Sequence, residues 1–181
     1  MKQKLNFEAL KKNLIDVIKE FQIKLGYAET SMGLYYPLES LNRLLDAELT
    51  VREMQEALLD FAGEVKDSLG DITCTHEDER FCFMVPAQGV AFVYYKTRDN
   101  GFLKAFIKKT GSCGCTIDDL ICVFQQYSTE VVCEKMNNGE FDYLLYFKDG
   151  EPDDYRYCIK FECGHAIYHR FTPKDYEAFQ F

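Results

Sequence analysis

The chain has 181 residues, 47% of them hydrophobic and 28% charged, and it carries a formal net charge of −9. This size and composition are typical of one globular domain, and the negative charge disfavours non-specific nucleic-acid binding, because neutralising phosphates requires a basic surface. The first residues enter an amphipathic pattern without the apolar core of a signal peptide, and no apolar run approaches the roughly 18 residues that span a bilayer, so we expect a cytoplasmic protein without a membrane partner.

Three helices are predicted in the first 70 residues. Apolar residues recur at steps of three and four in two long stretches, which is the spacing of one helix face. Thr50 and Glu53 form a capping box in front of the second long stretch. Residues 27–37, between the first helix and the short second one, are expected to form a loop. The predicted helices cover residues 7–25, about 38–45 and 51–69.

From residue 71 onward the apolar pattern changes to the period of two that is typical of strands. The run Val90–Tyr95 is apolar on both faces, which predicts a central strand covered on both sides. Asn-Gly at 138–139 and Asp-Gly at 149–150 indicate hairpins, and short helices are predicted at 102–109 and 117–127. The predicted strands cover residues 72–76, 81–85, 90–95, 131–135, 141–147, 155–162 and 165–171.

Together these elements predict an α+β fold in one domain over residues 1–181, with a helical layer over 1–70 and mainly antiparallel strands over 71–181. We expect the three N-terminal helices to pack on one face of a mostly antiparallel sheet of about seven strands, because both long apolar stripes need a surface to cover. The helix at 117–127 would then be a helical insertion between two groups of strands.

One stretch, from Lys24–Tyr27 through Leu34–Leu41, resembles an uncharacterised domain family of gut Firmicutes. That family has no known activity. The resemblance therefore implies a bacterial cytoplasmic protein, and it assigns no catalytic or binding residue.

Close pairs of cysteine and histidine suggest a metal site. Cys113-Gly114-Cys115 and Cys163-Gly164-His165 together offer three thiols and one imidazole, the ligand types that zinc prefers in a tetrahedron. Structural zinc sites typically place two or more residues between paired cysteines, so the single glycine in each pair is an atypical spacing. The alternative is that both glycines mark turns and the cysteines are packing residues. Zinc is thus the one cofactor that the sequence suggests.

Cys113 and Cys115 also precede a predicted helix N-terminus, where a helix dipole favours a reactive thiolate. Two carboxylates in that first turn, Asp118 and Asp119, oppose this effect because they repel a second anion. A nucleophile would further require a nearby base such as His165. In a reducing compartment, the default expectation for all eight cysteines is a free thiol.

The last predicted strands raise a question of orientation. The alternation at 155–162 predicts one buried face and one solvated face. In the next strand, Arg170 is expected to face water, which would place His165 and His169 toward the core as hydrogen-bonded residues.

No nucleotide-binding or hydrolase fingerprint is present, and the chain has only three histidines. Residues 1–25 have a net charge of +3, so the remaining residues carry −12. We therefore expect a non-enzymatic binding or interaction domain whose acidic face captures a basic protein partner, as an inhibitor or immunity-type protein does. The alternative is a metal-binding or thiol-dependent enzyme centred on Cys113, Cys115 and His165.

Overall fold

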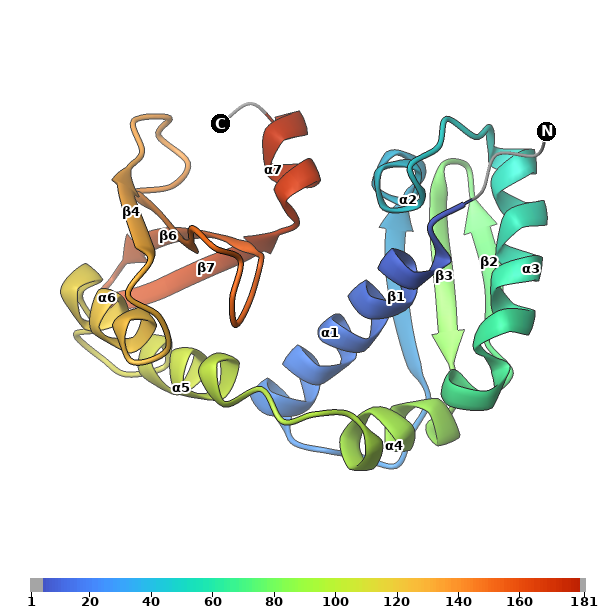
Figure 1. Cartoon of the computed structure of the whole chain (residues 1–181), viewed down its shortest axis with the longest axis horizontal. Helices are drawn as coiled ribbons and strands as arrows, with labels where there is room; N and C mark the ends of the chain where they lie inside the picture. The colour runs from blue at the N-terminus through green and yellow to red at the C-terminus, as the bar shows by residue number, and fades with distance from the viewer. Residues whose placement is uncertain (1–4, 180–181) are drawn as a thin grey trace. The chain divides into compact units, whose positions relative to one another are not determined.

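The computed structural model describes residues 5–179 and confirms the α+β class, with helices and two antiparallel sheets. Contacts divide the chain into two compact units, one ending at Arg98 and the other beginning at Asp99. Each unit has one sheet and a core of its own (Figure 1). The strands therefore do not form the single sheet that the sequence predicted. That the chain folds as one domain stays a prediction.

The first unit packs helices on a three-stranded sheet of order β1-β3-β2. Its helices lie on one face of this sheet, and α1 crosses in front of the strands in Figure 1. Alternate strand residues such as Leu34, Phe81 and Phe83 are buried against them, and Tyr36 donates a hydrogen bond of 2.8 Å to buried Asn13 of α1. The elements are α1 (Phe7–Leu25), β1 (Met32–Pro37), α2 (Leu38–Leu45), α3 (Val51–Leu69), β2 (Thr73–Glu77), β3 (Arg80–Val85) and α4 (Ala87–Lys96).

Two sequence predictions were wrong in this unit. The expected loop at 27–37 contains strand β1, which pairs with β3 from Met32 to Pro37. The expected strand at 90–95 lies within helix α4, because a short apolar run has no periodicity that separates a buried strand from a helix. Gly89 lets α4 approach the end of α3: a Cβ there would lie 2.2 Å from the carbonyl oxygen of Leu69.

The second unit has a four-stranded antiparallel sheet of order β4-β5-β6-β7. One face is covered by α5 and α6 through an aromatic cluster, in which Phe102 packs edge-on against Phe124 and Phe147 with ring centroids 4.8 Å apart. Phe106 makes the same kind of contact with Tyr157 of β6 at 4.8 Å. The elements are α5 (Gly101–Thr110), α6 (Ile117–Gln125), β4 (Val131–Lys135), β5 (Tyr143–Phe147), β6 (Arg156–Glu162), β7 (His165–Phe171) and α7 (Pro173–Phe179).

The other face of this sheet is not solvated throughout, contrary to the prediction from the alternation at 155–162. Cys158, expected on the solvated face, is fully buried with Phe141 and Leu144. Tyr176 of α7 packs against this small cluster and covers part of it. The sheet therefore buries apolar residues on both faces around Cys158.

Candidate functional site

A groove in the first unit lies where helices α1 and α3 begin. Helix α1 starts at Phe7, and its Asn6 cap accepts a hydrogen bond from the Ala9 N–H at 3.2 Å. The Asn6 N–H donates to the carbonyl oxygen of Leu45 at 3.2 Å, which ties the start of α1 to the end of α2. The ring of Phe7 packs edge-on against Phe61 of α3 with centroids 5.5 Å apart. These contacts fix the position of the α1 N-terminus beside α3.

The second wall of the groove is α3, whose start is fixed by the predicted capping box. Thr50 accepts a hydrogen bond from the Glu53 N–H at 3.4 Å, and the Glu53 carboxylate accepts one from the Thr50 N–H at 2.9 Å. The confirmed box therefore fixes both the start of α3 and the side chain of Glu53, which is one of the residues that line the groove.

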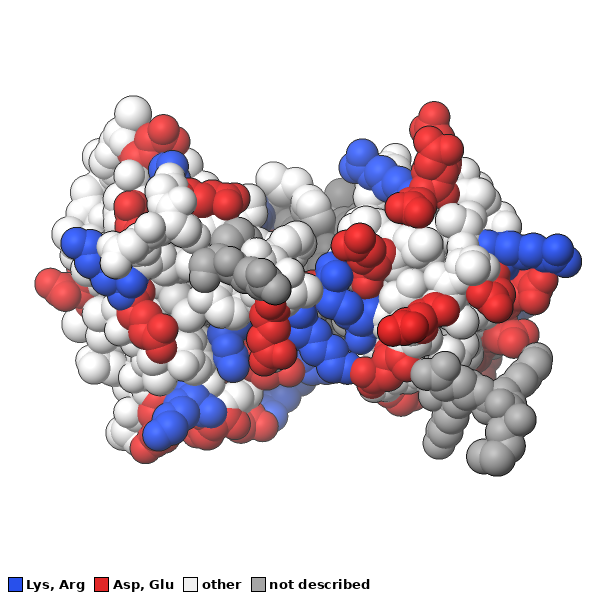
Figure 2. All heavy atoms as spheres, turned by 90° about the horizontal axis from the view of Figure 1, so that it is seen from above, with Lys and Arg blue, Asp and Glu red and all other residues white. Residues whose placement is uncertain are grey.

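The groove has a volume of about 930 Å³, an apolar floor and an acidic rim. Its apolar lining comes from both helices and from the segment that joins α2 to α3. No described residue that lines it carries a positive charge. Figure 2 shows one face of the first unit, on which acidic and basic side chains are interspersed. The apolar lining residues are Leu5, Phe7, Leu49 and Ala57, and the acidic ones are Glu8, Asp46, Glu53, Glu56, Asp60 and Glu64.

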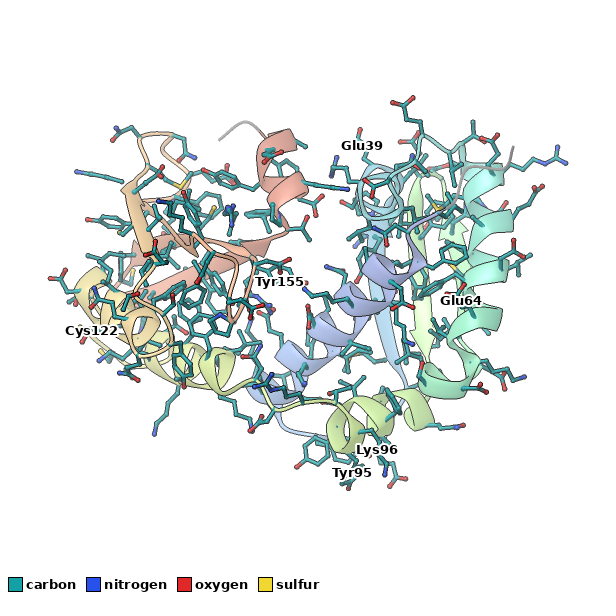
Figure 3. All side chains as sticks on the ribbon, in the orientation of Figure 1. Glu39, Glu64, Tyr95, Lys96, Cys122 and Tyr155 are labelled. Carbon is teal, nitrogen blue, oxygen red and sulfur yellow. The ribbon has the colours of Figure 1, made fainter. Side chains whose placement is uncertain are left out.

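Four of these carboxylates form a stripe along α3, which we call the α3 acidic stripe: Glu53, Glu56, Asp60 and Glu64, the last labelled in Figure 3. Steps of three and four residues place them on one helix face, over a length of about 16 Å at 1.5 Å per residue. Ala57 lies within the stripe and is 8% exposed, so the smallest side chain of this face forms part of the floor.

Contacts at the start of α3 favour the ionised form of Glu53. Hydrogen bonds from the backbone and side chain of Thr50 lower the pKa of Glu53 below its usual range. Glu56 lies 3.5 Å from the guanidinium of Arg52, an exposed pair, whereas Asp60 and Glu64 form no ion pair within residues 5–179. Like charges four residues apart destabilise a helix, so folding alone does not explain this arrangement.

Sequence reasoning missed the groove, although one signal was available. The apolar face of α3 was recognised from its periodicity, but the acidic residues of the same helix also recur at steps of three and four. That pattern predicts a negatively charged face. It does not predict the hollow beside this face, because the hollow depends on how residues from α1 and the α2–α3 connection pack against α3.

The residues predicted to bind zinc come from two segments that the structure brings together. The Gly114 N–H donates a hydrogen bond of 2.9 Å to the carbonyl oxygen of Gly164, so the loop after α5 lies against the turn between β6 and β7. Cys163 and Gly164 form this turn with φ of 51° and 78°. Asn and Gly are the usual residues at such turn positions, so a cysteine is unusual there.

The backbones of the loop after α5 and of the β6–β7 turn lie together, but the side chains of the four candidate zinc ligands do not group as closely. Cys113, Cys163 and His165 are exposed, whereas Cys115 is 6% exposed and its thiol donates to the carbonyl oxygen of Thr116 at 3.7 Å. Within residues 5–179, no three His, Cys, Asp or Glu side chains are arranged to hold a metal ion. The zinc site therefore stays a prediction. Its two backbone segments are adjacent, but its candidate ligand side chains are not arranged around a common point.

The residues around Cys115 also determine how reactive its thiol is. Burial, followed by the charge of Asp119, raises the pKa of Cys115 above its usual range. Asp119 itself caps α6 and lies 2.8 Å from Lys109, and these contacts lower its pKa to about 2. Asp119, one of the two carboxylates expected to oppose a thiolate, is thus charged and close to Cys115.

The predicted inward orientation of the histidines was wrong. His165 and His169 are exposed, while the side chain of Arg170 is only 5% exposed and lies 3.3 Å from buried Asp153. Arg170 also stacks on the ring of Tyr155 at 4.2 Å (Tyr155 is labelled in Figure 3). A charged residue can point inward when an opposite charge is buried beside it. Asp153 lies seventeen residues before Arg170 in the chain, so no local sequence pattern predicts that the two residues pair.

A second hollow lies on the outer face of the first unit's sheet, near the turn between β2 and β3. Its lining mixes charges of both signs, and the guanidinium of Arg80 already stacks over the ring of Tyr35 at 4.9 Å. It therefore lacks the uniform charge that distinguishes the groove beside α3.

These features define a two-sheet α+β protein with an acidic groove as its most distinctive surface. The chain belongs to the family described as "Domain of unknown function, E. rectale Gene description" (DUF3877), which matches residues 7–180. The resemblance to an uncharacterised domain family is thereby confirmed, over far more of the chain than the stretch that indicated it. No curated protein and no solved structure matches the chain. None of the helices within residues 5–179 combines the length and hydropathy required to cross a bilayer.

Proposed function

We propose that this protein is a non-enzymatic binding domain of the bacterial cytoplasm that captures a basic protein partner, in the manner of an inhibitor or immunity-type protein. The observation that supports this most is the groove between α1 and α3, which combines an apolar floor with a rim of carboxylates and has no cation among the lining residues that the structure describes. The floor supplies burial for apolar contacts, and the rim supplies steering and selection for positive charge.

Binding of a basic partner would also explain why α3 carries the acidic stripe, an arrangement of like charges that does not favour folding. The buried face of α3 holds the helix on the core through residues such as Met54, Phe61 and Val65, and the acidic stripe contributes nothing to that packing. A basic partner would relieve the repulsion along the stripe, so the free energy lost in the free protein is regained in the complex.

Affinity capture with a matched pair of variants tests this proposal. The groove variant carries Glu56→Gln, Asp60→Asn and Glu64→Gln. The control carries Glu130→Gln, Glu140→Gln and Glu151→Gln, three exposed residues of the second unit that produce the same change in net charge. We expect wild type and control to capture the same basic proteins from a bacterial lysate at low salt, and the groove variant to lose them.

Salt provides the second arm of the experiment. At physiological ionic strength the Debye length is about 8 Å, and it becomes shorter as salt is added. Raising the salt concentration should therefore weaken the attraction between exposed charges and release the captured proteins. A set of captured proteins that is unchanged by salt and by the groove variant would contradict the proposal.

A second candidate function is metal binding or thiol chemistry centred on Cys113, Cys115 and His165. The observation that favours it is the backbone hydrogen bond between Gly114 and Gly164, which holds the two segments together. Metal analysis of protein purified without chelator tests it directly. About one zinc per chain, with a melting temperature lowered by chelator, would support this candidate, because binding energy at a structural site is folding energy.

A further inference from the structure

The shape of the groove narrows the class of partner. Resting on the function proposed above, we propose that the groove binds an amphipathic helix of about three turns, with Lys or Arg along one side and apolar residues on the adjacent face.

The lining favours a helix over an extended peptide. Within residues 5–179, the groove is lined by α1 with its two preceding residues, by α3 and by the connection between α2 and α3, and no strand edge contributes to it. An extended segment would therefore find no ladder of backbone groups to pair with, whereas a helix satisfies its own backbone hydrogen bonds.

The α3 acidic stripe sets the length and spacing of the partner. Its carboxylates are separated by three, four and four residues, which spans about 16 Å, or three helical turns. A partner helix that runs alongside α3 has the same rise per residue, so basic residues at steps of three and four would face the carboxylates in register. Glu8 of α1 adds a carboxylate to the lining from outside α3.

Ala57 marks where an apolar side chain would enter. It is flanked along the stripe by Glu53 and Glu56 before it and by Asp60 after it, and its side chain ends at Cβ. Leu5, Phe7 and Leu49 complete the apolar floor around this point. A partner that is basic throughout would leave this floor uncovered, so the floor predicts an apolar row beside the basic one.

The test uses synthetic peptides and the full-length protein. The probe is a fluorescently labelled helical peptide of about 14 residues, with Lys at steps of three and four and Leu on the adjacent face. Two control peptides have the same charge: one with the same residues in an order that destroys the amphipathic pattern, and one with a central Pro that breaks the helix. Fluorescence anisotropy measures the affinity of each for wild type, for the groove variant and for the control variant.

We expect the amphipathic peptide to bind wild type and the control variant at least tenfold more tightly than either control peptide. The groove variant should lose most of this affinity. Ala57→Leu should weaken binding about tenfold by filling the floor, and its circular dichroism and melting temperature show whether the fold is intact. Asp60→Lys with Glu64→Lys, at exposed positions, reverses the charge of the rim without changing the apolar floor, and should also abolish binding.

The outcomes separate this inference from the function on which it rests. Equal affinities for all three peptides, all weakened by the groove variant, would overturn the helix while leaving capture of a basic partner in place. If no peptide binds and lysate capture does not depend on the groove residues, both are overturned. Tight binding of the amphipathic peptide that is insensitive to Ala57→Leu and to the charge reversal would place the site elsewhere and overturn the inference.

Discussion

The buried ion pair between Asp153 and Arg170 should be one of the most sensitive points of the second unit. Asp153 accepts hydrogen bonds from the Tyr155 N–H at 2.9 Å, from the Tyr157 hydroxyl at 3.0 Å and from Arg170 at 3.3 Å. The side chains of Asp153 and Arg170 are 3% and 5% exposed. Asp153→Ala would remove the acceptor of all three bonds and leave the guanidinium without its buried carboxylate.

The expected loss of stability is about 3–5 kcal/mol, the usual cost of removing one partner of a buried ion pair. Tyr157→Phe removes one hydrogen bond to the carboxylate and leaves the other two, so it should cost about 1.5–3 kcal/mol. Because much of the cost in Asp153→Ala comes from the stranded charge, the double variant with Arg170→Met should be no less stable than Asp153→Ala alone, although two side chains have been changed.

Urea denaturation followed by far-ultraviolet circular dichroism measures these differences, and the four proteins of the cycle give the coupling energy between the two residues. An Asp153→Ala protein within about 1 kcal/mol of wild type would refute the reasoning, because such values are typical of surface positions. So would single and double variants whose costs simply add, since residues in direct contact are expected to be coupled.

Three further predictions follow from local contacts. Gly89→Ala should cost about 1–3 kcal/mol in urea denaturation, because its Cβ would overlap the carbonyl oxygen of Leu69, whereas Gly63→Ala, with open space around it, should be neutral or stabilising. Asp119→Asn should lower the melting temperature at pH 7, and the difference should disappear as the pH falls toward 2, because a carboxylate with a lowered pKa stabilises the fold only while it is ionised. Burial raises the pKa of Cys158 to about 12, so iodoacetamide at pH 8 should alkylate it far more slowly than Cys113, as peptide mapping by mass spectrometry would show.

The long amphipathic helices could be predicted because one strong local signal fixed each of them. The stripes over 7–25 and 51–69 carry helix periodicity across several turns, and the capping box at Thr50 marks a start that the structure reproduces. The strands from 131 to 171 were equally accessible, since alternation and turn residues specify them locally. In these segments the local preference and the tertiary structure agree.

The wrong predictions share a different cause. Whether Val90–Tyr95 is helix or strand depends on its packing against α3, which requires the glycine at position 89. The inward direction of Arg170 depends on Asp153, seventeen residues earlier in the chain. Both are pairings between distant residues, and no local pattern records them. The same limit applies to the groove, which forms where α1 and the α2–α3 connection pack against α3.

The acidic groove implies that salt acts in opposite directions on the free protein and on its complex. In the free protein, salt screens the repulsion between Glu56, Asp60 and Glu64, so moderate concentrations should raise the melting temperature of wild type. The groove variant lacks these charges and should respond less. In the complex, the same ions screen the attraction between the rim and a basic partner, so affinity should fall over the same range of salt.

Melting curves and peptide anisotropy recorded at matched salt concentrations measure the two effects side by side. A melting temperature that rises equally in wild type and in the groove variant would show that the stripe is not the origin of the stabilisation, and that its carboxylates are too far apart to act as one charged surface.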